Sequence, residues 1–138
     1  MDKDLALSLA IDAVRAREAS YCPYSGFAVG AALLCSDGEI FTGANIESSS
    51  YTPTVCAERV AFFTAVHSGK RDFRAIAIVG GKSGTPLKSF CPPCGVCRQV
   101  MAEFATEDFE IILYDGSDTK IYTLAEIFPG SFTKENLK

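Results

Sequence analysis

The sequence predicts an α/β fold in which helices pack against a sheet. Strand-like apolar runs alternate along the chain with segments of helical character, and that alternation is typical of layered α/β proteins. The 138 residues suit a single domain, 1–138, large enough to bury about two-thirds of the surface that its unfolded chain would expose. Apolar residues make up 48% of the chain and charged residues 22%, which is ordinary for a globular protein.

The chain begins with an expected helix at residues 3–20. Its apolar residues Leu7, Ile11 and Val14 recur at helical spacing and share one face. The segment YCPYSG that follows contains proline and glycine, which end a helix.

Two apolar runs at 27–35 and 39–46 come next and flank the turn signal SDG, so they predict a β-hairpin. Residues 54–70 predict a largely apolar helix that ends at Gly69. Residues 73–81 form a continuous apolar run, as expected of a buried strand.

The last third of the chain continues the alternation. Residues 94–105 predict a helix and residues 109–115 a strand. Residues 120–128 read as a short strand that passes into a short helix. The sequence shows no internal repeat and no linker, in agreement with one domain.

Charge and hydropathy exclude some partners. The chain carries 13 Lys and Arg against 17 Asp and Glu, for a net charge of −4, and it has no run of basic residues. A nucleic acid polymer is therefore not expected as a partner, although a single nucleoside remains compatible. No stretch approaches the roughly 20 apolar residues of a membrane span, and the N-terminus lacks the features of a signal peptide. We expect a cytoplasmic protein with reduced cysteines and no membrane contact.

Three cysteines in the segment CPPCGVCRQV stand at intervals of three residues, so that Cys91, Cys94 and Cys97 form two overlapping C-x-x-C pairs. In a reducing compartment, clustered cysteines indicate metal binding or catalysis more than disulfides. The pair Cys91–Cys94 could be a thioredoxin-like redox dithiol, and the pair Cys94–Cys97 could be part of a metal site.

Another cysteine, Cys56, opens the segment CAER. Thr54 is a plausible N-cap, which would place Cys56 in the first turn of its helix. Pro93 suits the first position of the next helix, so Cys94 would lie at the start of that helix. Two helix N-termini would then direct thiols to a common point, and their dipoles favour thiolates.

Three converging thiolates, from Cys56, Cys94 and Cys97, describe a catalytic zinc site with one position open for water. A structural zinc knot would need a fourth ligand, and Cys91 is poorly spaced for that role because it shares Cys94 with the other pair.

Such a site raises an electrostatic problem, because zinc with three thiolates carries one net negative charge. Arg59, three residues after Cys56, is the first candidate to offset that charge, and Arg98 is the second. Glu58 is unusual in an apolar helix. It could simply complement the helix dipole, or it could carry protons to and from a zinc-bound water.

The combination of C-x-E with P-C-x-x-C-R-Q resembles the zinc-dependent cytidine deaminases, and the resemblance extends over nearly the whole chain. It implies a three-layer αβα sandwich around a mixed, roughly five-stranded sheet. It implies one Zn²⁺ per chain, held by Cys56, Cys94 and Cys97, and leaves Cys91 as an extra packing thiol.

The resemblance also implies the reaction and the substrate contacts. Cytidine and deoxycytidine would be hydrolysed at C4 to uridine and deoxyuridine with release of ammonia, as in pyrimidine salvage. Glu58 would be the catalytic residue, bound to N3 of the base. The other contacts would be Phe27 on the pyrimidine, the Ala57 N–H on O2, the Pro92 carbonyl near the leaving nitrogen, and Asn45 and Glu47 on the ribose.

Relatives of this length are homotetramers with shared active sites. The resemblance therefore implies that Phe132 reaches over the pyrimidine of an adjacent subunit and that Tyr51 contacts the ribose in the same way. The nearest functional neighbour is blasticidin-S deaminase, which shares the zinc motifs. The Asn45-x-Glu47 pair favours the nucleoside enzyme, and the Glu47 carboxylate favours nucleosides over nucleotides.

Overall fold

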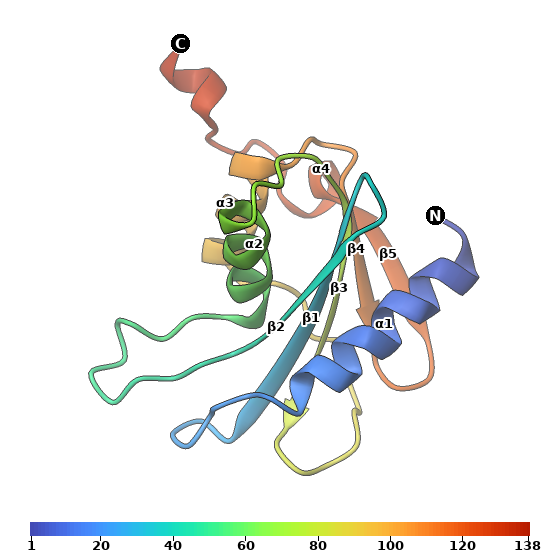
Figure 1. Ribbon diagram of the computed structural model, residues 1–138, viewed down its shortest axis with the longest axis vertical. Coiled ribbons are helices and arrows are strands. Elements are labelled where there is room, and N and C mark those ends of the chain that lie inside the picture. Colours follow the sequence, from blue (N-terminus) through green and yellow to red (C-terminus); the bar gives the residue numbers. More distant parts are fainter.

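A five-stranded sheet lies at the centre of the computed structural model, which describes residues 1–138 (Figure 1). The strands are β1 (Phe27–Cys35), β2 (Ile40–Ala44), β3 (Phe73–Lys82), β4 (Glu110–Tyr114) and β5 (Thr119–Thr123). Their order across the sheet is β2-β1-β3-β4-β5. The pair β3–β4 is parallel and the other pairs are antiparallel, so the sheet is mixed.

Helices cover both faces of this sheet. They are α1 (Lys3–Arg17), α2 (Ala57–His67), α3 (Gly95–Phe104), the short α4 (Leu124–Ile127) and the 3-10 helix η1 (Lys134–Leu137). Figure 1 shows α1 across one face, α2 and α3 on the other, and η1 projecting from the body at the C-terminus. The expected three-layer αβα sandwich around a mixed five-stranded sheet is confirmed.

Each face of the sheet has its own apolar core. Along β3, Ile76 and Ile78 pack with α2 and α3, whereas Ala75, Ala77 and Val79 pack with α1. Successive side chains of a strand point to opposite faces, so the continuous apolar run of β3 serves both cores at once, as its sequence predicted.

The buried face of α1 differs from the one that the sequence suggested. Leu7 and Ile11 are 43% and 37% exposed, and the helix ends at Arg17 rather than at residue 20. Mostly small side chains of α1 face the sheet, because the helix lies close to the strands. A Cβ added at Gly30 would be 2.1 Å from the Ala13 carbonyl oxygen. The buried face consists of Ala6, Leu9, Ala10, Ala13 and Arg17.

Two boundaries near the predicted site also differ. The strand expected over 39–46 ends at Ala44, and the helix expected from residue 54 begins at Ala57. Ile46 and Val55 instead pair with each other in an antiparallel bridge. This bridge closes the loop between β2 and α2 and leads the chain directly into the start of α2.

Gly43 lets the start of α2 lie against the sheet. A Cβ added at Gly43 would be 2.4 Å from the Ala57 carbonyl oxygen and 2.7 Å from the Ala61 nitrogen. Backbone atoms at those distances cannot be avoided by rotating a side chain, so only glycine fits beneath this turn. The predicted site residues Cys56 and Glu58 lie in the same turn, and Gly43 therefore helps to position them.

Replacement of Gly43 by alanine should displace the first turn of α2. We expect Gly43→Ala to lower the free energy of unfolding by about 1–3 kcal/mol, as overpacking usually does, and to weaken metal retention. Thermal unfolding and metal analysis measure both effects. Gly95→Ala is the control for stability, because its added Cβ has no neighbour within 4 Å. Equal melting temperatures for the two variants would contradict this role of Gly43.

No helix of the structure has the length and apolar character needed to cross a membrane.

Candidate metal centre and active site

Two of the predicted ligands are the N-cap residues of helices. Cys56 is the N-cap of α2 and Cys94 is the N-cap of α3, and neither side chain makes a capping hydrogen bond to a backbone N–H of its helix. The predicted caps are therefore wrong by a few residues: the Thr54 hydroxyl accepts from the Ser48 N–H, and Pro93 precedes the cap of α3. Both sulfurs remain available for a shared ligand.

The sulfurs of Cys56, Cys94 and Cys97 lie within 4.8 Å of one another, and the Cys56 and Cys94 sulfurs are 3.8 Å apart. Cys97 is buried one turn into α3, Cys56 is half-buried and Cys94 is exposed. A tetrahedral Zn²⁺ with bonds of about 2.3 Å holds its sulfur ligands roughly 3.8 Å apart. The spacing therefore fits zinc, and one side of the cluster is open.

The pKa values of two of these thiols are shifted in opposite directions. The pKa of Cys56 is lowered to about 5, first because the Cys97 thiol donates to its sulfur, and further because of Arg59 and Cys94, although burial opposes the shift. The pKa of Cys97 is raised, because it keeps the proton that it donates to Cys56 and because it is buried. Helix N-termini add to the stabilisation of thiolates here.

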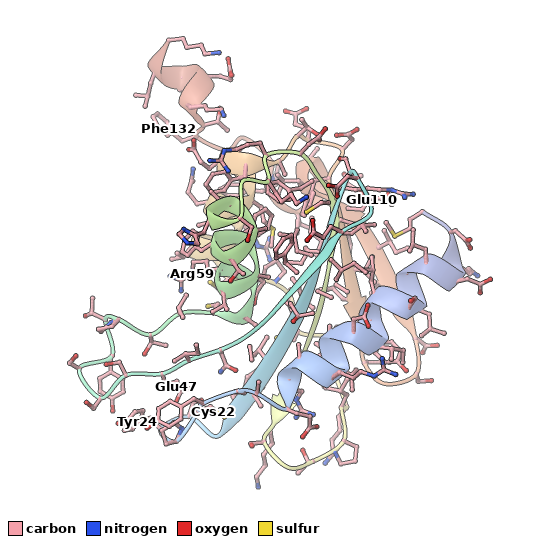
Figure 2. All side chains as sticks on the ribbon, in the orientation of Figure 1. Cys22, Tyr24, Glu47, Arg59, Glu110 and Phe132 are labelled. Atoms are coloured by element: carbon pink, nitrogen blue, oxygen red, sulfur yellow. The ribbon has the colours of Figure 1, made fainter.

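Arg59 is the cation of this cluster. Its Nη2 atom donates to the Cys56 sulfur at 3.4 Å, and its buried Nε atom has no partner; Figure 2 labels Arg59 on α2. Arg98, the second candidate, donates instead to the backbone carbonyls of Pro93 and Ile127. The structure therefore distinguishes the two candidates. Arg59 contacts a sulfur, whereas Arg98 connects α3 to the end of α4.

Glu58 is buried beside the sulfurs, in the first turn of α2, with only 4% of its surface exposed. Burial raises the pKa of its carboxyl group to about 7, and the negative charge of Cys56 acts in the same direction. Its Oε1 atom is buried without a hydrogen-bond partner. An acid that only complements a helix dipole can remain in solvent, whereas a buried carboxyl oxygen without a partner suits proton transfer to a bound molecule.

Asn45 lies at the end of β2 and is largely buried. Its Oδ1 atom accepts from the Val29 N–H at 2.9 Å and from the Ser20 hydroxyl, and its Nδ2 atom donates to the Phe27 carbonyl at 2.8 Å. Asn45 therefore joins the end of β2 to the start of β1, which also fixes the backbone of Phe27. The Phe27 side chain is 44% exposed.

Glu47 is exposed and is held by the loop that precedes β1. Its Oε1 atom accepts from the N–H groups of Tyr24 and Ser25 at 3.0 and 3.1 Å, and its Oε2 atom accepts from the Ser25 hydroxyl. The Ser25 hydroxyl in particular lowers the pKa of Glu47, so the group is a fixed carboxylate. Tyr24 and Ser25 were not among the predicted contacts, because the turn segment YCPYSG indicates a tight loop but does not indicate that this loop binds Glu47.

Tyr51 and Phe132 lie far apart in the folded chain. Tyr51 is 70% exposed, adopts a positive φ of 43°, and packs its ring edge-on to Tyr24 at a centroid distance of 5.9 Å. It lines a hollow of about 220 Å³ together with Glu47. Phe132 is 60% exposed, and Figure 2 shows it far from Tyr24 and Glu47. Within a single chain the structure does not bring Phe132 to the other predicted contacts.

An αβα sandwich that presents three sulfurs and a buried glutamate at two helix starts has the features of the zinc-dependent deaminases of nucleobases. Comparison with known proteins agrees. Residues 5–113 match the family described as the cytidine and deoxycytidylate deaminase zinc-binding region. The chain belongs to this family.

Relatives and solved structures point the same way. The chain is 48% identical to the cytidine deaminase of Sporosarcina psychrophila, with 94% of this chain and 92% of that protein covered. The crystal structure of cytidine deaminase from Burkholderia pseudomallei matches with a TM-score of 0.83 at 40% identity, covering 96% of this chain and all of that one. Blasticidin-S deaminase of Bacillus cereus is 33% identical, with 77% of each chain covered.

The cysteine cluster leads to a direct prediction. Metal analysis should find one zinc per chain, and Cys56→Ser, Cys94→Ser and Cys97→Ser should each reduce it strongly, because each removes one of three thiolates. Cys91→Ser is the matched control and should retain zinc, because its sulfur is not part of the cluster. Loss of zinc from the Cys91 variant would instead support a four-cysteine structural site.

Proposed function

We propose that this chain is a zinc-dependent cytidine deaminase, which hydrolyses cytidine and deoxycytidine to uridine and deoxyuridine with release of ammonia. The observation that carries the proposal is the buried, unpartnered Oε1 atom of Glu58 beside the three-sulfur cluster. Residues 1–138 would act as one catalytic domain, and the reaction would serve pyrimidine salvage.

When bound by Cys56, Cys94 and Cys97, zinc supplies a Lewis acid that lowers the pKa of a water molecule, so that water can attack at neutral pH. Glu58 takes a proton from the attacking water and returns protons to N3 of the base and to the leaving amine. A carboxyl group with a pKa near 7 suits both directions of transfer. Arg59 offsets the excess negative charge of the thiolates, which would otherwise oppose loss of a proton from the water.

Other residues bind and orient the nucleoside. The buried Ala57 places its N–H at the start of α2, where it donates to O2 of the base. The Phe27 ring faces the pyrimidine, and the Pro92 carbonyl accepts from the departing nitrogen. Glu47, kept ionised by Ser25, accepts from a ribose hydroxyl, and its charge disfavours a phosphate. Asn45 adds a second ribose contact through its Nδ2 group, which has one hydrogen beyond the bond to Phe27.

A homotetramer with shared sites completes the proposal. Phe132 and Tyr51 are among the most exposed aromatic residues of the chain, and Phe132 lies too far from its own chain's Glu47 to share a ligand with it. In the assembly, Phe132 would cover the pyrimidine bound by a neighbour and Tyr51 would contact a ribose. We place the protein in the cytoplasm, because reduced thiols are stable there and the site needs three of them.

The function is tested by incubating the purified, zinc-loaded protein with cytidine, deoxycytidine and, separately, blasticidin S. We expect absorbance loss at the cytidine band and ammonia release with both nucleosides, and little reaction with blasticidin S. Turnover of blasticidin S alone would favour the second candidate, which the similarity to the Bacillus cereus protein supports. No turnover of any substrate by zinc-loaded protein would contradict the proposal.

A further inference from the structure

Cys91 packs against Gly80 of the sheet, next to the Phe27 ring. An ideal Cβ atom on Gly80 would lie 2.7 Å from the Cys91 sulfur, 3.0 Å from its Cβ atom and 3.1 Å from Cε1 of Phe27. Gly80 belongs to β3, on the face shared with Ile76 and Ile78, which is the face covered by α2 and α3. The absent side chain of Gly80 thus leaves room for the thiol and the ring edge side by side.

The same thiol lies next to the proposed reaction centre. Cys91 precedes the ligand Cys94 by three residues. Burial first, and then the negative charges of Glu58, Cys56 and Cys94, raise the pKa of Cys91 to about 11. Cys91 is not one of the three clustered sulfurs. It therefore lies beside the Phe27 ring edge without joining the metal site.

The order of atoms around a cytosine ring indicates what Cys91 would face. In the proposed pose, O2 is at the Ala57 N–H, N3 is at Glu58, and the 4-amino group is at the Pro92 carbonyl. The next ring atom after C4 is C5, and the residue before Pro92 is Cys91. We propose that Cys91 forms the wall beside C5 of the pyrimidine and, seated on Gly80, sets the size of the 5-substituent that the enzyme accepts.

This inference rests on the proposed function and makes Cys91 a specificity residue rather than a catalytic one. A pocket that gains or loses one carbon atom typically discriminates substrates by about 10-fold to 200-fold. Enlarging the wall residue should therefore exclude a 5-methyl group, and shrinking it should admit one, whereas the reaction of unsubstituted cytidine should change less.

The experiment measures competition between cytidine and 5-methylcytidine in one mixture, followed by chromatography of both products. The ratio of the two kcat/KM values then does not depend on the amount of active enzyme. Relative to the wild type, we expect Cys91→Ala to raise the preference for 5-methylcytidine by about tenfold and Cys91→Leu to lower it by about tenfold or more. Cys22→Ala, at another half-buried cysteine, is the control and should leave the ratio unchanged.

The outcomes separate the two proposals. A ratio that stays constant in both Cys91 variants, or moves in the opposite direction, overturns the C5 wall while cytidine turnover still supports the deaminase. A wild-type protein that does not deaminate cytidine would contradict both the deaminase function and the C5 wall. If Cys91→Leu fails to fold, the Cys91→Ala ratio decides alone, because a role in packing only would reduce turnover of both nucleosides equally.

Discussion

Replacement of Glu58 by glutamine should remove nearly all deaminase activity while the protein stays folded and retains zinc. Glutamine keeps the size of the buried side chain but cannot carry a proton, and a general acid–base group typically contributes ~10²–10⁴-fold to the rate. A residue that serves both the attacking water and the leaving amine should reach the upper part of that range. Steady-state kcat and metal content are the two measurements.

The control for this variant is Glu18→Gln, at an exposed glutamate just after α1. It changes the same chemical group far from the sulfur cluster and should leave kcat unchanged. Near-normal turnover by zinc-loaded Glu58→Gln protein would show that another group moves the protons and that the buried, unpartnered carboxyl oxygen has a different role.

Loss of the Phe132 ring should have the second large effect. The segment that carries it is anchored through its backbone, because the Gln99 side chain donates to the Phe132 carbonyl at 2.9 Å, while the ring itself is exposed. If the ring stacks on a base in a neighbouring site, Phe132→Ala should weaken nucleoside binding by ~1–3 kcal/mol, by analogy with other base–aromatic stacks. Leu137→Ala, at a more exposed apolar residue of the same segment, should have little effect on KM.

Co-expression of two impaired chains tests whether the site is shared. If the proposed tetramer forms, mixed assemblies of Glu58→Gln and Phe132→Ala chains would contain some sites with both residues intact. They should then regain part of the activity that each variant lacks alone. Verified mixed tetramers without any recovery, or a fully active monomer by light scattering, would contradict a shared site.

Local patterns in the sequence predicted the metal centre well. The spacings C-x-E and P-C-x-x-C place Cys56, Glu58, Cys94 and Cys97 at helix starts, and the three sulfurs do converge. The predicted cap of α2 was wrong because the Ile46–Val55 bridge, a contact between the two sides of a loop, delays the start of that helix. A cap is a local signal, and here a longer-range pairing overrides it.

Contacts that depend on distant segments were harder to predict. Arg59 and Arg98 were both plausible cations near the sulfurs. Only the fold shows that Arg98 donates to the backbone carbonyls of Pro93 and Ile127. The exposed position of Leu7 and Ile11 follows from the close approach of α1 to Gly30, which hydrophobic periodicity does not reveal. Similarly, Ser25 and Glu47 meet because the Tyr21–Ile46 bridge joins the loop before β1 to the segment after β2, a contact between distant segments.

In the proposed reaction, this chain uses its three-cysteine site and Glu58 to add water at C4 of cytidine. Its most direct test is conversion of cytidine by the zinc-loaded protein in water enriched with oxygen-18, with mass spectrometry of the product. We expect uridine that carries oxygen-18 at position 4, formed by the wild type and not by Glu58→Gln. Uridine without the label, or equal labelled product from both proteins, would contradict it.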